Sequence, residues 1–326
     1  MLNLPRILDA AIEAPIITSF SRIGCVVRSR SEHWTALDDY DLSGRTAVVT
    51  GATSGLGRAI AEQLARCGSG VVLWGRDRSK TERTRDEIAA ATGKSALDVA
   101  IADLAEPDSV RAAATGLLAA HPRLDVLVHN AGSLSGTRQT NSLGHEVTVA
   151  SQVLGPFLLT SLLLDRLRSS AIARVITMSS GGMYTAPLMV DRLEMTSDYR
   201  GTEQYARVKR AQVTLNELWA SRVPAREVVF HAVHPGWADT PGVQESLPGF
   251  RRVMRPILRT PAEGADTTVW LAADDEAVQS SGGFWHDRRR RPIHRLGSTR
   301  RSDTEQRRLE LWDWCVTNTG ESPSIP

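Results

Sequence analysis

The sequence predicts an α/β fold: a doubly wound parallel sheet with helices on both faces. Two observations lead to this prediction. From residue 45 onward, short apolar runs of strand length alternate with longer stretches of helical periodicity, which is typical of βαβ units. The first apolar run leads directly into the glycine turn Gly51-Ala-Thr-Ser-Gly55-Leu-Gly57, which opens a helix. No repeat or low-complexity linker divides residues 41–287, so we expect a single domain there.

The expected strands and helices follow one another in regular order. Strands are recognised as short, mostly apolar runs, and helices by apolar residues three or four positions apart. The expected strands cover 46–50, 71–74, 97–101, 126–129, 174–178 and 228–233, with Phe284 and Trp285 as a last, edge strand. The expected helices cover 55–67, 78–91, 108–120, 146–168, 203–221 and 261–273, and the helix from 146 to 168 is expected to be one long element.

Composition restricts the classes of function. The 326 residues are 41% hydrophobic and 23% charged, and the formal net charge of +2 gives no argument for nucleic-acid binding. Cys25, Cys67 and Cys315 are widely spaced and form neither a disulfide framework nor a zinc pattern, so we expect no metal and a cytoplasmic location. No uninterrupted run approaches 18 apolar residues, so a membrane span is not expected.

The two ends of the chain differ from its centre. Residues 1–40 form an N-terminal extension in which apolar residues and charges alternate, which favours an amphipathic helix packed on the main body. Peripheral membrane contact and an oligomer arm are the alternatives. Residues 288–326 form an arginine-rich tail with a short helix, and nine arginines stand against three acidic residues between 287 and 308. Without interleaved aromatic residues, this tract is expected to be solvated or paired with acids, and no nucleic acid is expected as a partner.

Tyr205 and Lys209 are four residues apart in an expected helix. Positions i and i+4 lie on one face, so the phenol and the ammonium point the same way. A nearby cation favours the phenolate and therefore lowers the pKa of the phenol. The pair predicts a proton donor and acceptor at neutral pH.

The glycine turn predicts a dinucleotide site of the Rossmann type. Gly51, Gly55 and Gly57 permit a tight turn and a close backbone approach, and the free N–H groups at the start of the following helix suit a pyrophosphate. At the end of the second strand, Gly75 is followed by Arg76 rather than by an acid. An arginine can hold a 2′-phosphate, which favours NADP(H) over NAD(H), although Asp77 follows one position later.

Seven motifs occur along the chain in a fixed order: Thr50-Gly-Ala-Thr-Ser-Gly-Leu-Gly57, Asp103-Leu104, Asn130-Ala-Gly132, Ser180, the Tyr205/Lys209 pair, Pro235-Gly236 and Thr240. Together they resemble the short-chain dehydrogenase/reductase family over roughly residues 41 to 287. A subgroup of that family, dehydrogenase/reductase family member 12, is resembled by Ser179-Ser-Gly-Gly-Met183, His234-Pro-Gly-Trp-Ala-Asp-Thr-Pro-Gly242, Gly264-Ala-Asp-Thr267 and Trp270-Leu-Ala272.

The resemblance implies a role for each matching residue. Asp103 would bind the adenine, and Asn130 would support the sheet edge that holds the nucleotide. Ser180, rather than Ser179, would bind the substrate oxygen. Tyr205 would transfer the proton, Lys209 would grip the nicotinamide ribose, and Thr240 would contact the nicotinamide amide. The implied cofactor site comprises Gly51, Thr53, Ser54, Gly55, Leu56, Gly57, Arg76, Asp103, Leu104, Asn130, Ala131, Gly132, Tyr205, Lys209, Pro235, Gly236 and Thr240, and the implied catalytic set is Ser180, Tyr205, Lys209 and Gln152.

The chain departs from the family pattern in two places. Gln152 stands where the family has an asparagine that helps to hold a water near the lysine in a proton relay. Either the backbone carbonyl at this position does the work and the change is mild, or the side chain does and the relay is in doubt. Ser180 and Tyr205 are also 25 residues apart, about twice the usual spacing. The extra segment, with Met183, Tyr184, Leu188 and Met189, resembles that of the retinol-dehydrogenase-like branch and either lines an apolar substrate mouth or packs the insertion.

The expected function is that of an NADP(H)-dependent oxidoreductase that interconverts a carbonyl and an alcohol, acting on a lipophilic small molecule. One alternative is a dinucleotide-binding sensor or scaffold without turnover, supported only by Gln152. Another is a sugar-nucleotide epimerase, although such enzymes usually space their glycines G-x-x-G-x-x-G, unlike this chain. The family tends to form dimers or tetramers through the helices that hold Gln152 and Tyr205, so a homo-oligomer is a further possibility.

Overall fold

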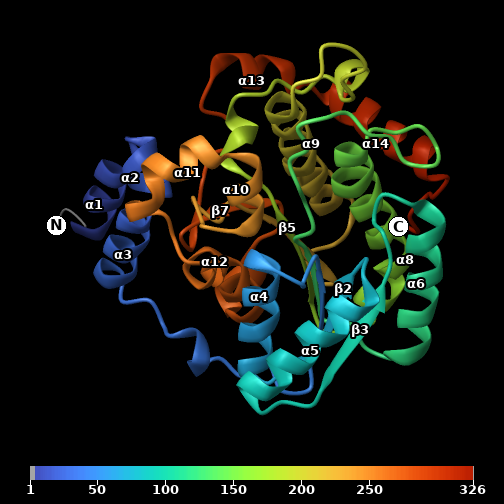
Figure 1. Ribbon diagram of the computed structural model, residues 1–326, viewed down its shortest axis with the longest axis horizontal. Helices are drawn as coiled ribbons and strands as arrows, with labels where there is room; N and C mark the ends of the chain where they lie inside the picture. Colours follow the sequence, from blue (N-terminus) through green and yellow to red (C-terminus); the bar gives the residue numbers. More distant parts are fainter. Residues whose placement is uncertain (1–3, 326) are drawn as a thin grey trace.

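The computed structural model describes residues 4–325 and contains one eight-stranded sheet between two layers of helices (Figure 1). The strands are β1 (Thr46–Thr50), β2 (Gly70–Gly75), β3 (Leu97–Ile101), β4 (Val126–His129), β5 (Ala173–Met178), β6 (Val228–Val233), β7 (Gly283–His286) and β8 (Arg289–Arg290). Their order is β3-β2-β1-β4-β5-β6-β7-β8, with β1 to β7 parallel and β8 antiparallel to β7. The predicted doubly wound sheet is therefore confirmed. The order reverses between β1 and β4, where such sheets bind ligands at the carboxyl ends of the strands.

Each face of the sheet is covered by its own helices and its own apolar core. On one face lie α4 (Gly55–Arg66), α5 (Arg78–Thr92) and α12 (Pro261–Ala273), which bury Ile60, Ile88 and Trp270 against the sheet. On the other lie α6 (Pro107–Ala120), α8 (Gly155–Arg168) and α9 (Gly201–Arg222), which bury Phe157 and Val208. Shorter helices are α1 (Leu4–Glu13), α2 (Ile16–Phe20), α3 (Arg22–Ser31), α7 (Val147–Val149), α10 (Pro241–Ser246), α11 (Pro248–Met254) and α13 (Gly297–Ser302), and a last helix is α14 (Glu305–Thr319).

One prediction of local structure was wrong. The segment 284–285 is not at the edge of the sheet, because the chain turns back after β7 and β8 pairs with it. The long helix expected over 146–168 is present as one helical segment, Val147–Arg168, but it contains a turn of π-helix over Ala150–Leu154 between α7 and α8. Pro156 lies just beyond this turn and has no N–H for the regular i to i−4 ladder, which is a physical reason for the irregularity.

Within residues 4–325, one helical segment, Val147–Arg168, is long and apolar enough by composition to cross a membrane. It is 83% buried inside the protein, because α6, α9 and α14 pack around it. This burial identifies the segment as a core helix of the fold, and its apolar character follows from contact with protein on most of its surface.

The N-terminal residues and the arginine tract meet on one side of the molecule, whereas the C-terminus lies on the other side in Figure 1. We call residues 4–31, which form α1 to α3, the N-terminal arm; the arm lies beside α11 and α12 in Figure 1. The arginine tract pairs with acids of the arm and of the main body: Arg291 with Asp9 (2.7 Å), Arg289 with Glu32 (2.7 Å) and Arg288 with Asp266 (2.7 Å). Of the two expectations for the tract, solvated or paired with acids, the structure shows the pairing with acids, and Arg288 is buried.

Candidate active site

The glycine turn is closed too tightly to accept side chains. Gly51 has a left-handed backbone (φ +65°), and a Cβ on Gly57 would lie 2.2 Å from the carbonyl oxygen of Gly51. The Asn130 Nδ2 atom donates to the Thr50 carbonyl at 2.9 Å, which ties the end of β4 to the end of β1. Asn130 therefore braces the turn directly across the point where the strand order reverses.

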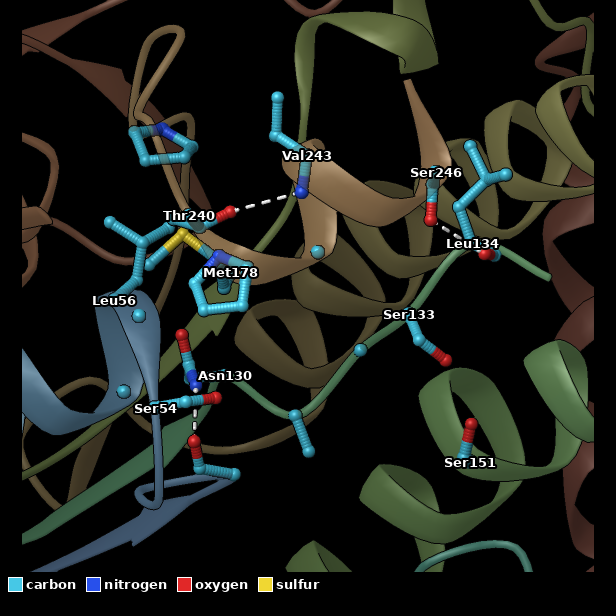
Figure 2. Close-up of a pocket in the computed structure, with 18 of the residues that line it drawn as sticks. Ser54, Leu56, Asn130, Ser133, Leu134, Ser151, Met178, Thr240, Val243 and Ser246 are labelled. Atoms are coloured by element: carbon cyan, nitrogen blue, oxygen red, sulfur yellow. Dashed lines mark hydrogen bonds between the residues drawn. The ribbon is translucent and has the colours of Figure 1, made fainter. Parts of the chain in front are cut away.

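This turn delivers the start of α4 to a large pocket. No side-chain hydrogen bond from the described residues caps α4 at its N-cap residue Ser54. Gly55, Leu56 and Gly57 line a pocket of about 780 Å³, so the first-turn N–H groups of a 12-residue helix lie at the pocket wall (Figure 2). Uncapped amides and a helix dipole favour an anion at this position. The residues present therefore fit the pyrophosphate of a dinucleotide.

One end of the pocket lies at the carboxyl ends of β2 and β3. Arg76, Asp103 and Leu104 line it as expected. The Asp77 Oδ1 atom accepts a hydrogen bond from the Lys80 amide at 2.9 Å, so this carboxylate caps α5. Lys80 also lines the pocket and is exposed. Sequence reasoning missed Lys80; its spacing one turn beyond Arg76, at the start of the following helix, was the available signal.

Tyr205 and Lys209 lie on one face of α9, as their spacing predicted, and both line the pocket. The Lys209 Nζ atom is 5.1 Å from the centroid of the Tyr205 ring. Ser180 follows β5 and interacts with the Tyr205 hydroxyl, whereas the buried Ser179 hydroxyl donates to the Lys209 carbonyl (3.2 Å). Ser180 is therefore the serine of the pair whose hydroxyl meets the tyrosine.

The expected lowering of the tyrosine pKa was wrong for the protein without a cofactor. Burial raises the pKa of Tyr205 to about 12, and the hydrogen bond with Ser180 only partly opposes this. Burial also lowers the pKa of Lys209 to about 7, because the ammonium has no carboxylate partner among the described residues. Desolvation of both groups thus outweighs the attraction between the Lys209 ammonium and the Tyr205 phenolate, on which the sequence prediction was based.

Gln152 does not point into the main pocket. Its Nε2 atom donates to the Ser133 carbonyl at 2.8 Å, and its Oε1 atom would lie 2.7 Å from a Cβ on Gly132. The Gln152 backbone carbonyl instead accepts a hydrogen bond from Gln212 Nε2 at 2.8 Å. The sequence left open whether the backbone carbonyl or the side chain of Gln152 acts near the lysine. In the structure, the carbonyl is the group that is linked to Lys209, through Gln212.

The wall opposite the glycine turn is the loop 234–240 with the helices that follow it. Gly236 has φ +74°, and a Cβ there would lie 2.2 Å from Arg259 Nε. Thr240 caps α10, its Oγ1 accepting from the Val243 amide at 3.3 Å (Figure 2), and its side chain lies close to Gly55, where an added Cβ would be 3.3 Å from the Thr240 Cβ. Pro235, Gly236 and Thr240 line the pocket as expected.

The N-terminal arm holds this loop from behind. Phe20 packs edge-on against His234, with ring centroids 4.2 Å apart, and the Phe20 carbonyl accepts from the Trp237 amide at 2.7 Å. Arg259 donates to the Phe20 and Ser19 carbonyls and to the Asp287 carboxylate. The sequence carried no local signal for these residues, because their partners lie more than 200 positions away or in other elements.

The mouth of the pocket is bridged and partly apolar. The Ser246 hydroxyl on α10 donates to the Leu134 carbonyl at 3.0 Å, which joins α10 to the loop after β4 (Figure 2). The apolar side of the mouth is formed by Leu134, Val147, Trp237, Val243, Leu247 and Phe250. By contrast, Met183, Tyr184 and Leu188 are buried in the core and do not line the pocket, so these insertion residues pack the fold.

Comparison with known proteins agrees with this geometry. The family model of short chain dehydrogenases matches residues 45–249. The bovine protein named dehydrogenase/reductase SDR family member 12 is 40% identical over 278 residues, which cover 83% of this chain and 86% of the relative. The chain belongs to the short-chain dehydrogenase/reductase family. Mouse retinol dehydrogenase 11 is 32% identical, with 80% of this chain and 83% of the relative covered.

Solved structures with the same fold include two that align over most of this chain. A protein from Mycobacterium paratuberculosis aligns with a TM-score of 0.70 at 27% identity, covering 89% of this chain and 98% of its own. A short-chain dehydrogenase from Shigella flexneri, solved with NADP, aligns with a TM-score of 0.61 at 25% identity, covering 76% and 98%. This short-chain dehydrogenase/reductase is therefore an NAD(P)-dependent oxidoreductase.

Proposed function

We propose that this enzyme interconverts a carbonyl and an alcohol on a lipophilic small molecule and that it uses NADP(H). The observation that carries the proposal is the convergence of Ser180, Tyr205 and Lys209 in the pocket that the start of α4 also lines. A protein that only sensed a dinucleotide would need the glycine turn but not a proton-transfer pair beside it.

The chain's own residues account for the proton side of the reaction. A bound nicotinamide supplies or accepts the hydride at C4. Ser180 donates a hydrogen bond to the substrate oxygen and polarises the carbonyl. Tyr205 gives its proton to that oxygen during reduction and takes it back during oxidation, and the Lys209 ammonium stabilises the phenolate. Because the pKa of Tyr205 is raised to about 12, the phenol starts protonated, which suits a proton donor in the reductive direction.

The preference for NADP(H) rests on the charges at the β2 end of the pocket. Arg76 and Lys80 are both exposed there, and they can hold a 2′-phosphate. The acid that could bind a ribose 2′-hydroxyl, Asp77, is engaged in capping α5. The preference for a lipophilic substrate rests on the apolar mouth around Trp237 and Phe250.

A screen of NADPH oxidation against lipophilic aldehydes and ketones tests the proposal, with Tyr205→Phe as the matched variant. The variant keeps the ring and loses the hydroxyl, so turnover is expected to fall at least ~100-fold. NADPH should still raise the melting temperature of Tyr205→Phe, because a ligand of the folded state stabilises it. Unchanged turnover in the variant would refute the mechanism, and absence of turnover with every carbonyl would favour the sensor.

We also propose that the N-terminal arm rests on an anionic lipid surface. Ile7, Ile16, Ile17 and Ile23 are exposed on the arm, whereas its acids Asp9 and Glu13 are turned inward to arginines. Apolar side chains beside the exposed Arg22, whose guanidinium also pairs with Glu263 (2.8 Å), give this face the character of an interfacial helix. Sedimentation with phosphatidylserine vesicles should carry the protein down, and the double variant Ile16→Ser/Ile17→Ser should stay in solution. Self-association of the protein without vesicle binding would contradict the proposal.

The C-terminal helix bears on the oligomeric state. α14 packs on both α8 and α9, where Trp312 contacts Phe157 and Trp219 with ring centroids 5.0 and 4.8 Å apart. We propose that α14 occupies the helix surface through which family members tend to associate, so that no dimer forms through α8 and α9. Sedimentation equilibrium tests this: a dimer broken by a charge on the exposed face of α8 or α9 would refute it.

A further inference from the structure

Gln212 lies one turn beyond Lys209 on α9 and is almost fully buried. The Lys209 Nζ atom donates to Gln212 Oε1 at 3.0 Å and to the Met178 carbonyl at 2.9 Å. The other end of the same amide, Gln212 Nε2, donates to the backbone carbonyl of Gln152 at 2.8 Å. One side chain thus joins the lysine of the active site to the interrupted helix.

The orientation of this amide is fixed by its two partners. An ammonium can only donate a hydrogen bond and a carbonyl can only accept one, so the amide oxygen must face Lys209 and the NH₂ group must face Gln152. The Gln152 carbonyl is free to accept this hydrogen bond because it lies in the π-helical turn. Pro156, four residues further along the chain, has no N–H that could donate to it. The π-helical turn therefore leaves a carbonyl free, and the Gln212 side chain uses that carbonyl as its hydrogen-bond acceptor.

The surroundings of Lys209 leave few other groups to hold it. Among the residues 4–325, no carboxylate pairs with Lys209, and the titratable group that faces it is Tyr205 on its own helix. A cavity of about 30 Å³ is lined by Gln152, Gln212 and Asn216 but not by Lys209.

We propose that Gln212 is a positioning residue that holds the Lys209 ammonium beside Tyr205 by bridging it to the Gln152 carbonyl. The proposal rests on the proposed function of the Tyr205–Lys209 pair. An amide has no ionisable proton at neutral pH, so Gln212 orients the lysine and does not itself carry the proton.

Two variants test this bridge. Gln212→Leu removes the acceptor from Lys209, which disfavours the charged lysine, whereas Gln212→Glu places a carboxylate there, which favours it. The control is Asn216→Leu, one turn further along α9, where another buried amide is lost that donates only to the Gly283 carbonyl. All three variants disturb the same helix, so a merely structural role would give them similar effects.

The readout is the pH at which Lys209 titrates in the folded protein without cofactor. It is obtained from melting temperature against pH, each variant being compared with the same variant carrying Lys209→Met. We expect this pH to move down by about one unit in Gln212→Leu, up by about one unit or more in Gln212→Glu, and not at all in Asn216→Leu. Equal titration in all of them, or a shift in one direction for both Gln212 variants, would overturn the proposal.

A kinetic measurement separates this proposal from the proposed function. With a carbonyl substrate in hand, Gln212→Leu should lower kcat about 10-fold or more and leave KM within about twofold, because binding of the substrate is not disturbed. If Tyr205→Phe keeps full turnover, the proposed mechanism fails, while opposite pH displacements in the two Gln212 variants would still establish the bridge. A kcat that is unchanged in Gln212→Leu while Tyr205→Phe is inactive would refute the positioning role.

Discussion

The two walls of the pocket are built by different means. The cofactor wall uses backbone: a glycine turn, uncapped amides of α4 and the Asn130 brace, all at the ends of adjacent strands. The opposite wall uses buried charge. Its loop 234–240 rests on Arg259 and on the N-terminal arm, and Asp287 accepts from both Arg259 (2.5 Å) and Arg28 (2.6 Å).

The difference teaches how far each wall tolerates change. The cofactor wall depends on the absence of side chains, so its weak points are the positions where a methyl group would collide. The opposite wall depends on compensation between buried ions. Burial would raise the pKa of Asp287, but Arg259 outweighs this and holds the pKa of that carboxyl well below its usual range. Removing one partner therefore leaves an uncompensated charge.

The largest expected effect is on the charged wall. Asp287→Asn keeps the shape and tolerates the left-handed backbone at this position (φ +52°), but leaves Arg28 and Arg259 without their shared anion. Breaking a buried ion pair in this way costs about 3–5 kcal/mol of unfolding free energy. Urea denaturation measures it. The exposed Asp275→Asn is the control and should change stability by less than about 0.5 kcal/mol. Equal effects of the two substitutions would remove the distinction between the walls.

Gly57→Ala tests the cofactor wall. The added Cβ would lie 2.2 Å from the Gly51 carbonyl oxygen and 2.4 Å from Asn130 Nδ2, so the turn must shift. Overpacking of this kind costs about 1–3 kcal/mol, and a displaced turn should also weaken NADPH binding. Gly116→Ala on α6, where nothing lies within 4 Å of the new Cβ, is the matched control. NADPH affinity retained in Gly57→Ala would show that the turn yields more easily than its contacts imply.

Arg76→Ala tests the open end of the cofactor wall. A hydrogen bond to a charged group contributes about 1.5–3 kcal/mol, so NADPH affinity should fall roughly 10–100-fold while NADH affinity stays the same. Titration of nicotinamide fluorescence measures both. Lys80→Ala should act in the same direction. Equal affinities for NADPH and NADH in the unmodified protein would refute the proposed preference.

The smallest expected effect lies between the walls, at Lys209. Burial lowers its pKa to about 7 from the 10.5 of a free lysine, so the unfolded chain binds more protons between these pH values. Stability should therefore rise with pH across this window, by at most about 1.4 kcal/mol per unit, relative to Lys209→Met. Unfolding free energies of the two proteins at pH 7 and pH 8 measure the difference. Parallel pH profiles would show that Lys209 is not desolvated.

The sequence predicted the cofactor wall and most of the sheet because their determinants are local. A strand, three glycines and a helix start stand within a dozen residues, and Tyr205 and Lys209 share one helical turn. Arg28 and Asp287 are 259 residues apart, and neither differs locally from an exposed surface charge. Burial also reversed the expected pKa of Tyr205, because desolvation depends on all the chain packed around a group and not on its neighbour alone.

The ion pair between Arg28 of the N-terminal arm and Asp287 has a consequence for the order of events during synthesis. The glycine turn, Tyr205 and Lys209 are all made before residue 210, yet the carboxylate that joins Arg28 to Arg259 is supplied at residue 287. Domains generally fold as units, and contacts of long sequence separation close late. A nascent chain therefore carries Arg28 without its Asp287 partner until almost the whole protein has been made. A chain truncated before residue 287 therefore keeps Tyr205 and Lys209 but lacks the carboxylate that supports the loop 234–240. The loop reaches its final support only when almost the whole chain has been made.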